Sequence, residues 1–258
     1  MTTPARRQYL DIKSQHEDAI LLYQIGDFFE TFDEDARLVA RELQIVLTRR
    51  SYGPDEAVPL AGVPVHAIDN YAAKLLAKGY RVAICEQVAP PGRGLVRREV
   101  TRVLTPGTVV EPALVAAARD NYLVAVAFAR HGSGRSRAAS IGLAYVEATS
   151  GAFACTEWPT ERAEDEFSDE LRRLAPGEVL MADSVRATQS DHAPDTITVT
   201  GWAGETPVTW CPDRYFDEES AHTRLRRHFG VPSLAPFGCE RAYLAATAAG
   251  AILAYLDR

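Results

Sequence analysis

Two large aromatic side chains lie between carboxylates in the segment Gly26-Asp27-Phe28-Phe29-Glu30, directly after an apolar run. In an extended strand, Phe28 and Glu30 face one side of the chain and Phe29 faces the other. If both phenylalanines belonged to the core, Phe28 would share a buried face with Glu30, and an ionised glutamate is rarely buried without a partner. We therefore predict that Phe29, and Phe32 beyond it, are buried, whereas Phe28 does not fit a place in the core.

The sequence contains no recognisable catalytic motif. None of the three lysines, Lys13, Lys74 and Lys78, follows a glycine, so a GxxxxGK[ST] nucleotide-binding loop is absent, and GxSxG, HExxH and GxGxxG are absent too. Two acids near predicted strands, Asp120 and Glu147, are candidates for a metal-dependent nuclease, but scattered acids are much more often surface or capping residues than a two-metal site. We predict that this chain is not an enzyme and holds no cofactor or metal.

The composition indicates a globular protein of the cytoplasm. Of the 258 residues, 47% are hydrophobic and 24% are charged. No apolar run approaches the ~18 residues of a membrane helix, and no apolar segment follows the first arginines as it would in a signal peptide. The four cysteines are widely spaced and form no CxxC motif, which favours reduced thiols over disulfides or a zinc site.

The charge is distributed unevenly along the chain. Residues 1–115 hold 14 Lys+Arg and 15 Asp+Glu, whereas residues 116–258 hold 14 and 20. A nearly neutral half followed by an acidic half suggests two domains with different partners. The net charge of −7 argues against a generic nucleic-acid coat protein, and any contact with a phosphate backbone should come from the first half. We expect domains of residues 1–115 and 116–258.

The elements that must position Phe28 and Glu30 form a mixed-sheet α/β domain. Hydrophobic periodicity and capping residues predict its helices and strands. The helices are expected at 3–13, 33–43 and 68–78. The strands are expected at 19–25, 45–48, 81–88 and 100–104, and residues 28–32 are expected to be either extended or looped. Polar loops are expected at 51–56 and 90–94.

The second half is expected to follow the strand and helix order of a ribonuclease-H-like α/β domain. After a connecting helix at 113–118, three meandering strands are predicted at 122–129, 139–149 and 152–158, with turns at 132–134 and 150–151. They are followed by a helix at 161–174, a strand at 179–181, a polar loop at 183–195, an apolar alternation at 197–199, and helices at 218–229 and 240–256. A fold of this kind does not by itself indicate function.

Several motifs resemble the MutS family of DNA mismatch repair proteins. In the first half these are, in the order found in that family, residues 23–32 (YQIGDFFETF), 47–50 (LTRR), 59–66 (PLAGVPVH), 82–87 (VAICEQ) and 102–108 (RVLTPGT). In the second half the likeness is looser and rests on residues 120–123, 142–145, 149–153 and the closing alanine-rich helix. The resemblance implies a mismatch-recognition domain over 1–115 and a connector domain over 116–258.

The resemblance also implies roles for individual residues. Phe28 matches the family's intercalating phenylalanine, and Glu30 matches its base-contacting glutamate. The arginines that could contact the DNA backbone, each equally interpretable as a surface residue, are Arg49, Arg50, Arg97, Arg98 and Arg102. Gly62-Val63-Pro64-Val65-His66 is either a second contact loop, through Gly62, Val63, Pro64 and His66, or a rigid turn leading into a helix.

The family's further domains, a core, a clamp and an ATPase, would follow Arg258, so we expect an N-terminal fragment, with a naturally short form as the alternative. The implied partners are mismatched double-stranded DNA and, through the connector, MutL. ATP and Mg²⁺ are implied for the ATPase domain only. The family works as a homodimer, but this chain is expected to be a monomer in the bacterial cytosol, associated with the nucleoid. A protein-docking module with little DNA binding remains an alternative.

Overall fold

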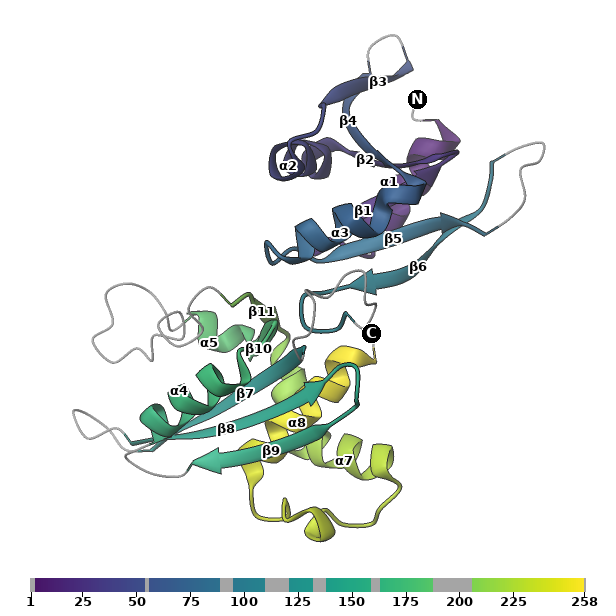
Figure 1. Cartoon of the computed structure of the whole chain (residues 1–258). Coiled ribbons are helices and arrows are strands. Elements are labelled where there is room, and N and C mark those ends of the chain that lie inside the picture. Colours follow the sequence, from purple (N-terminus) through teal and green to yellow (C-terminus); the bar gives the residue numbers. More distant parts are fainter. Residues whose placement is uncertain are drawn as a thin grey trace. The chain divides into compact units, whose positions relative to one another are not determined.

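The computed structural model describes residues 3–53, 56–88, 95–109, 121–131, 138–158, 163–187 and 206–257 (Figure 1). The chain divides into two units, residues 1–119 and residues 120–258. Each unit contains a mixed sheet and helices, so the predicted α/β fold class is confirmed. No helix in the described ranges is long and apolar enough to span a bilayer. The segments predicted at 90–94, 113–118, 132–134 and 197–199 lie outside the described residues.

The first unit is a six-stranded sheet with the strand order β3-β4-β2-β1-β5-β6. Strands β1 and β5 run parallel, and the other neighbouring pairs are antiparallel. The helices are α1 (Pro4–Lys13), α2 (Asp33–Leu43) and α3 (Ile68–Leu76). The strands are β1 (Ile20–Ile25), β2 (Phe28–Phe32), β3 (Thr48–Gly53), β4 (Glu56–Pro64), β5 (Val82–Gln87) and β6 (Arg98–Leu104).

Strand β1 is buried on both of its faces, which its run of apolar residues permits. Ile20 and Leu22 belong to the core that α2 and α3 complete, whereas Leu21 and Tyr23 pack on the α1 side of the sheet. Helix α1 begins at an N-cap, where the hydroxyl of Thr3 accepts a hydrogen bond from a backbone N–H. In the strand order, β2 lies between β1 and β4 and is thus an interior strand of the sheet.

The prediction for residues 45–56 was wrong. Residues 45–47 form no strand, β3 begins only at Thr48, and the segment expected to be a polar loop contributes to the β3–β4 hairpin instead. Ile45 packs against the core, but Val46 is 81% exposed, so this short apolar run is not a buried strand. Polar residues are compatible with β3 because it is an edge strand, with one side free of the sheet.

The second unit is a five-stranded sheet with the strand order β11-β10-β7-β8-β9. The neighbouring strands β7, β8 and β9 pair antiparallel, whereas β10 pairs in parallel with β7 on one side and with β11 on the other. The strands are β7 (Tyr122–His131), β8 (Ala138–Glu147), β9 (Phe153–Trp158), β10 (Glu178–Ala182) and β11 (Val208–Cys211). The helices are α4 (Ala163–Leu174), α5 (Asp183–Ala187), α7 (Glu218–Phe229) and α8 (Tyr243–Leu256).

Helix α8 is rich in alanine because it lies close against the sheet, on the face opposite α4 (Figure 1). A Cβ atom added to Gly142 in β8 would come 2.2 Å from the backbone carbon of Leu244, so glycine at this position permits the contact. Two predictions for this unit need correction. Residues 183–187 form α5 and not a loop, and the strand β11 was not predicted.

Candidate functional site

Phe28 and Phe29 lie on opposite faces of β2, as predicted. Phe28 is 47% exposed, whereas Phe29 is only 2% exposed and packs in the core with α2 and α3. The turn before Phe28 contains Gly26 in the left-handed region, at a φ of 59°, where glycine fits without steric cost. The first aromatic ring after this turn is therefore presented to solvent, and the second anchors the strand.

The exposed ring of Phe28 lines an open hollow of about 510 Å³, together with Asp27, Pro64, Val65 and His66. The register between β2 and β4 places Phe28 opposite Pro64. The backbone N–H of Val65 donates a hydrogen bond of 2.9 Å to the carbonyl of Asp27, which holds the two segments together. The structure thus brings together two segments that the sequence analysis singled out separately.

The segment predicted as either a contact loop or a helix-entry turn has features of both. Gly62, Val63 and Pro64 end strand β4, and a short 3-10 turn from Val65 to Ala67 leads directly into α3. Val63 is buried, whereas His66 is exposed at the hollow. The segment is therefore a rigid connection whose last residues also line the hollow beside Phe28.

Glu30 lies on the same face of β2 as Phe28, and its carboxylate forms an ion pair with the guanidinium of Arg50 from β3. The Glu30 side chain is 17% exposed and that of Arg50 is 39% exposed. Burial raises the pKa of Glu30, and the nearby Arg50 opposes that shift. The sequence analysis did not foresee this ion pair, which partly neutralises the charge of the Glu30 carboxylate.

The five candidate arginines do not form one group. Arg49, which is exposed, and Arg50 lie on edge strand β3, whereas Arg98 and Arg102 lie on β6 at the opposite edge of the sheet, and Arg97 directly precedes β6. Only the β3 pair is thus close in sheet order to β2, with β4 between them.

Arg98 has extensive contacts within the unit. Its guanidinium donates a hydrogen bond of 2.6 Å to the carbonyl of Gln24 and another of 3.0 Å to the carbonyl of Val96. It also lies 4.8 Å from the ring centre of Tyr23. Arg97 forms an exposed ion pair with Glu99. These contacts favour a structural role for Arg98, in which it fastens β6 to β1.

The geometry of Glu147 gives no support to a nuclease site. Its buried carboxylate accepts hydrogen bonds from the backbone N–H groups of Thr149, at 3.0 Å, and Ser150, at 2.6 Å, at the turn between β8 and β9. The other candidate, Asp120, lies outside the described residues. Within the described ranges, no group of three or more His, Cys, Asp or Glu residues could hold a metal ion.

Glu147 should instead stabilise the fold in a pH-dependent way. The hydrogen bonds from Ser150, and then those from Thr149, lower the pKa of Glu147 to about 2 from an ordinary value of 4.5. A lowered folded-state pKa contributes stability that is present above pH 4.5 and is lost as the pH falls toward 2. Glu147→Gln should reduce the free energy of unfolding at pH 7 and flatten its decline in acid, as measured by urea unfolding at a series of pH values. The exposed Asp165→Asn is the control, and an unchanged acid limb in Glu147→Gln would contradict the prediction.

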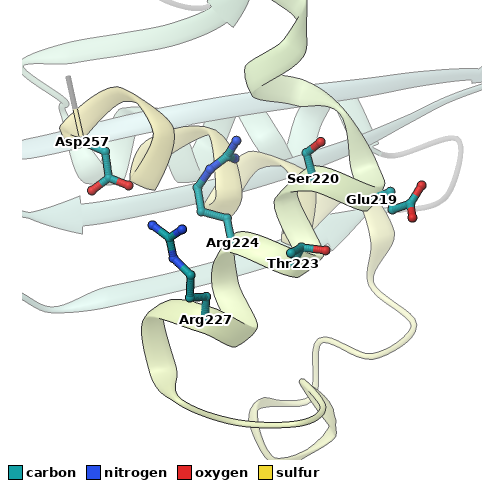
Figure 2. Close-up of a pocket in the computed structure, with 6 residues that line it drawn as sticks. All are labelled: Glu219, Ser220, Thr223, Arg224, Arg227 and Asp257. Atoms are coloured by element: carbon teal, nitrogen blue, oxygen red, sulfur yellow. The ribbon is translucent and has the colours of Figure 1, made fainter.

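The second unit has a hollow of about 380 Å³ beside α7 and the end of α8 (Figure 2). Arg227 projects from α7 toward Asp257 at the end of α8, whereas Arg224 points toward the middle of α8. Arg224 donates a hydrogen bond of 2.7 Å to the carbonyl of Gly250, so it connects α7 to α8. The remaining lining residues are Glu219, Ser220 and Thr223. Two acidic and two basic side chains thus line this hollow, and their arrangement does not indicate a reaction or a ligand.

Comparison with known families agrees with the two-unit structure. Residues 3–113 match the model of MutS domain I, and residues 121–258, more than half of the chain, match the model of MutS domain II. The chain belongs to the MutS family. The resemblance that the sequence motifs indicated is therefore confirmed.

Curated MutS proteins of several bacteria are similar to this chain over its whole length. The DNA mismatch repair protein MutS of Dehalococcoides mccartyi is 44% identical over 259 residues, which cover 99% of this chain and 27% of that protein. The MutS of Symbiobacterium thermophilum is 44% identical over 99% of this chain and 28% of its own length. The MutS of a Synechococcus strain is 41% identical over 100% of this chain and 29% of its own length. The chain thus spans less than a third of the length of these relatives.

Proposed function

We propose that the first unit recognises mispaired or unpaired bases in duplex DNA and so initiates mismatch repair. The observation that carries this proposal is the exposed ring of Phe28 at the edge of an open hollow, with the carboxylate of Glu30 on the same face of the strand. The other aromatic residues of β2, Phe29 and Phe32, are buried. The exposed ring of Phe28 lies beside a concave surface, which supports contact with a ligand.

In the proposed mechanism, Phe28 enters the duplex from the minor groove and stacks on one base of the mispair. Separating two stacked base pairs costs on the order of a few kcal/mol, which the wider contact with kinked DNA repays. A mispaired base has already lost part of its pairing and stacking, so the ring meets less resistance there. The protein would then read the deformability of the duplex, which allows one site to detect many different errors.

Glu30 would contact the mispaired base on which Phe28 stacks. Its carboxylate can accept a hydrogen bond from a base or, when protonated, donate one. Because burial raises the pKa of Glu30, its protonated form persists to a higher pH than in an exposed glutamate. On matched DNA, by contrast, a carboxylate near the phosphates weakens binding, which favours the mispair by comparison.

The test is a binding measurement with the 258-residue chain and fluorescently labelled duplexes that differ only in one mispair. Roughly 50 mM salt should be used, because a chain with a net charge of −7 gains little from counterion release. A 2-aminopurine next to the mispair reports unstacking through its fluorescence. We expect tighter binding to the mismatched duplex and increased 2-aminopurine fluorescence. Equal affinity for both duplexes, with no fluorescence change, would contradict the proposal.

A further prediction concerns the pair of Glu30 and Arg50. Glu30→Gln should tighten binding to the matched duplex several-fold, because the repulsion of phosphates is lost while the side-chain shape is kept. Arg50→Gln should weaken binding to both duplexes. If Arg50 contacts one phosphate, its loss should reduce the slope of log K against log salt concentration by about 0.9. Fluorescence anisotropy over a salt series measures both effects.

Arg37→Gln is the matched control for this prediction, because it removes one positive charge from an exposed ion pair on α2. A salt slope that changes equally in Arg37→Gln and Arg50→Gln would mean that Arg50 acts only through the net charge. A matched-duplex affinity that stays constant in Glu30→Gln would contradict the proposed repulsion.

For the whole protein, we propose that the second unit connects the recognition unit to further domains and docks MutL. Exposed aromatic side chains on this unit, Phe229, Phe237 and Tyr243, support a docking role. Binding of ATP and Mg²⁺ would belong to the ATPase domain of a homodimeric, full-length protein in the bacterial cytoplasm, near the nucleoid. Interferometry with purified MutL and this 258-residue chain tests the docking part, and absence of binding would contradict it.

A further inference from the structure

Two thiols from distant parts of the second unit are in contact. The Sγ atoms of Cys155, in β9, and Cys239, four residues before α8, lie 3.5 Å apart. Both residues are half-buried and carry free thiols. The Sγ atom of Cys239 also lies 3.3 Å from the carbonyl oxygen of Phe237. The fold therefore juxtaposes two thiols that are 84 residues apart in the sequence.

The segment that carries Cys239 has room to adjust. A short 3-10 turn from Ala235 to Phe237 ends at Gly238, whose φ is 73°, and a Cβ atom added to that glycine would meet nothing within 4 Å. Phe237 is 52% exposed. A disulfide requires an S–S distance of about 2.05 Å, so the two sulfur atoms must approach further. Because the residues on both sides of Cys239 are exposed, this movement need not disturb the sheet.

We propose that Cys155 and Cys239 form a reversible disulfide when the protein meets a small-molecule disulfide of the glutathione class. The bond would tie the segment between α7 and α8 to edge strand β9. Both cysteines line an apolar cavity of about 250 Å³ that Phe153, Phe229 and Phe237 also line. Oxidation would therefore fix one wall of that cavity. This inference concerns the second unit and does not depend on the proposed recognition of DNA.

The chemistry consists of two thiol–disulfide exchanges. The thiolate of Cys239 attacks one sulfur of oxidised glutathione, which forms a mixed disulfide and releases one glutathione thiolate. The thiolate of Cys155 then attacks Sγ of Cys239, which forms the intramolecular bond and releases the second glutathione thiolate. The two cysteines together lose two protons and two electrons, and one glutathione disulfide becomes two glutathione thiols.

The order of the two steps follows from the surroundings of the two thiols. Burial, with Cys239 as a further contributor, raises the pKa of the Cys155 thiol to about 12, so this thiol is a slow first nucleophile at neutral pH. Cys239 lies between the exposed residues Gly238 and Glu240, where a reagent can reach it. In the second step the attacked sulfur is already adjacent, so a small thiolate fraction of Cys155 is sufficient.

The other two cysteines provide internal controls. Cys85 is fully buried in β5 of the first unit, and Cys211 is 1% exposed in β11. Burial raises the pKa of Cys85 to about 12 as well. Neither thiol has a second cysteine within hydrogen-bonding distance in the described part of the chain. Both should stay reduced while the chain remains folded.

The experiment is to incubate the folded chain with excess oxidised glutathione at pH 8, block the remaining thiols with N-ethylmaleimide in denaturant, and count them by intact mass. We expect two blocked thiols in place of the four in the reduced chain. Peptide mapping should identify a bond between Cys155 and Cys239, and dithiothreitol should restore all four thiols. Cys155→Ser should instead accumulate the mixed disulfide on Cys239, whereas Cys239→Ser should retain its three thiols.

Three outcomes would overturn the proposal. These are four unmodified thiols after the incubation, a wild-type chain that stops at the mixed disulfide, and a bond that involves Cys85 or Cys211. Serine substitutions at these half-buried positions change little volume, and circular dichroism of each variant confirms that it is folded before the thiols are counted.

Discussion

Replacing Phe28 by alanine should abolish the preference for mismatched over matched duplex and leave the stability of the chain almost unchanged. The ring is about half exposed in the free protein, so its removal costs little on folding, within ~0.5 kcal/mol for a surface substitution. Without the ring, nothing enters the stack at the mispair, and the ratio of the two binding constants should fall to about one. Fluorescence anisotropy measures the ratio, and urea unfolding measures the stability.

Two control variants distinguish the loss of an inserted aromatic ring from a general loss of apolar surface. Phe28→Tyr keeps a flat ring and should retain most of the preference, whereas Val46→Ala removes a more exposed apolar side chain of the same unit and should not affect it. A Phe28→Ala chain that still prefers the mispair would refute the proposed insertion of the Phe28 ring. A Phe28→Ala chain that unfolds would show that the ring belongs to the core.

Most of the elements that position the site follow from short-range signals in the sequence. The apolar run before Gly26 predicted the buried strand β1, and the alternation after it predicted that Phe28 and Phe29 face opposite sides. The helices α2 and α3 were predicted from apolar side chains at helical spacing. In these segments the local pattern and the tertiary environment agree, so the local pattern is sufficient.

The β3–β4 hairpin was not predicted because strand β3 lacks a local signal. Residues 49–51 are polar, and a polar edge strand cannot be distinguished from a loop by composition alone. The pairing that makes this segment a strand comes from β4, which in turn pairs with β2. Only the register of the assembled sheet therefore shows that the segment belongs to it.

The ion pair of Glu30 with Arg50 could not be predicted for the same reason. The two residues are 20 positions apart and reach each other across strand β4, which lies between β2 and β3. The sequence analysis did recognise that a glutamate beside Phe28 needs a partner if it is buried, and five arginines were candidates for DNA contact. Which of them lies beside Glu30 depends on the strand order, which a single sequence does not reveal.

Replacing Phe29 by alanine should have the opposite effect to the change at Phe28. Phe29 is 2% exposed and packs with Val39, Ala61 and Ile84 among the residues of the core on the α2 and α3 side. Removing a buried phenylalanine ring costs ~3–5 kcal/mol through lost transfer free energy and the cavity that remains. The free energy of unfolding of the first unit should fall by this amount, as measured by urea unfolding.

The Phe29→Leu variant should lose clearly less stability than Phe29→Ala, because leucine fills much of the cavity. Since small domains are stable by only ~5–15 kcal/mol, Phe29→Ala should be studied at low temperature, where a folded fraction remains. That fraction should still prefer the mispair, because Phe28 is intact. If Phe29→Ala instead folded normally and lost the preference while Phe28→Ala unfolded, β2 would present its other face to DNA, and Glu30 would no longer lie beside the displaced base.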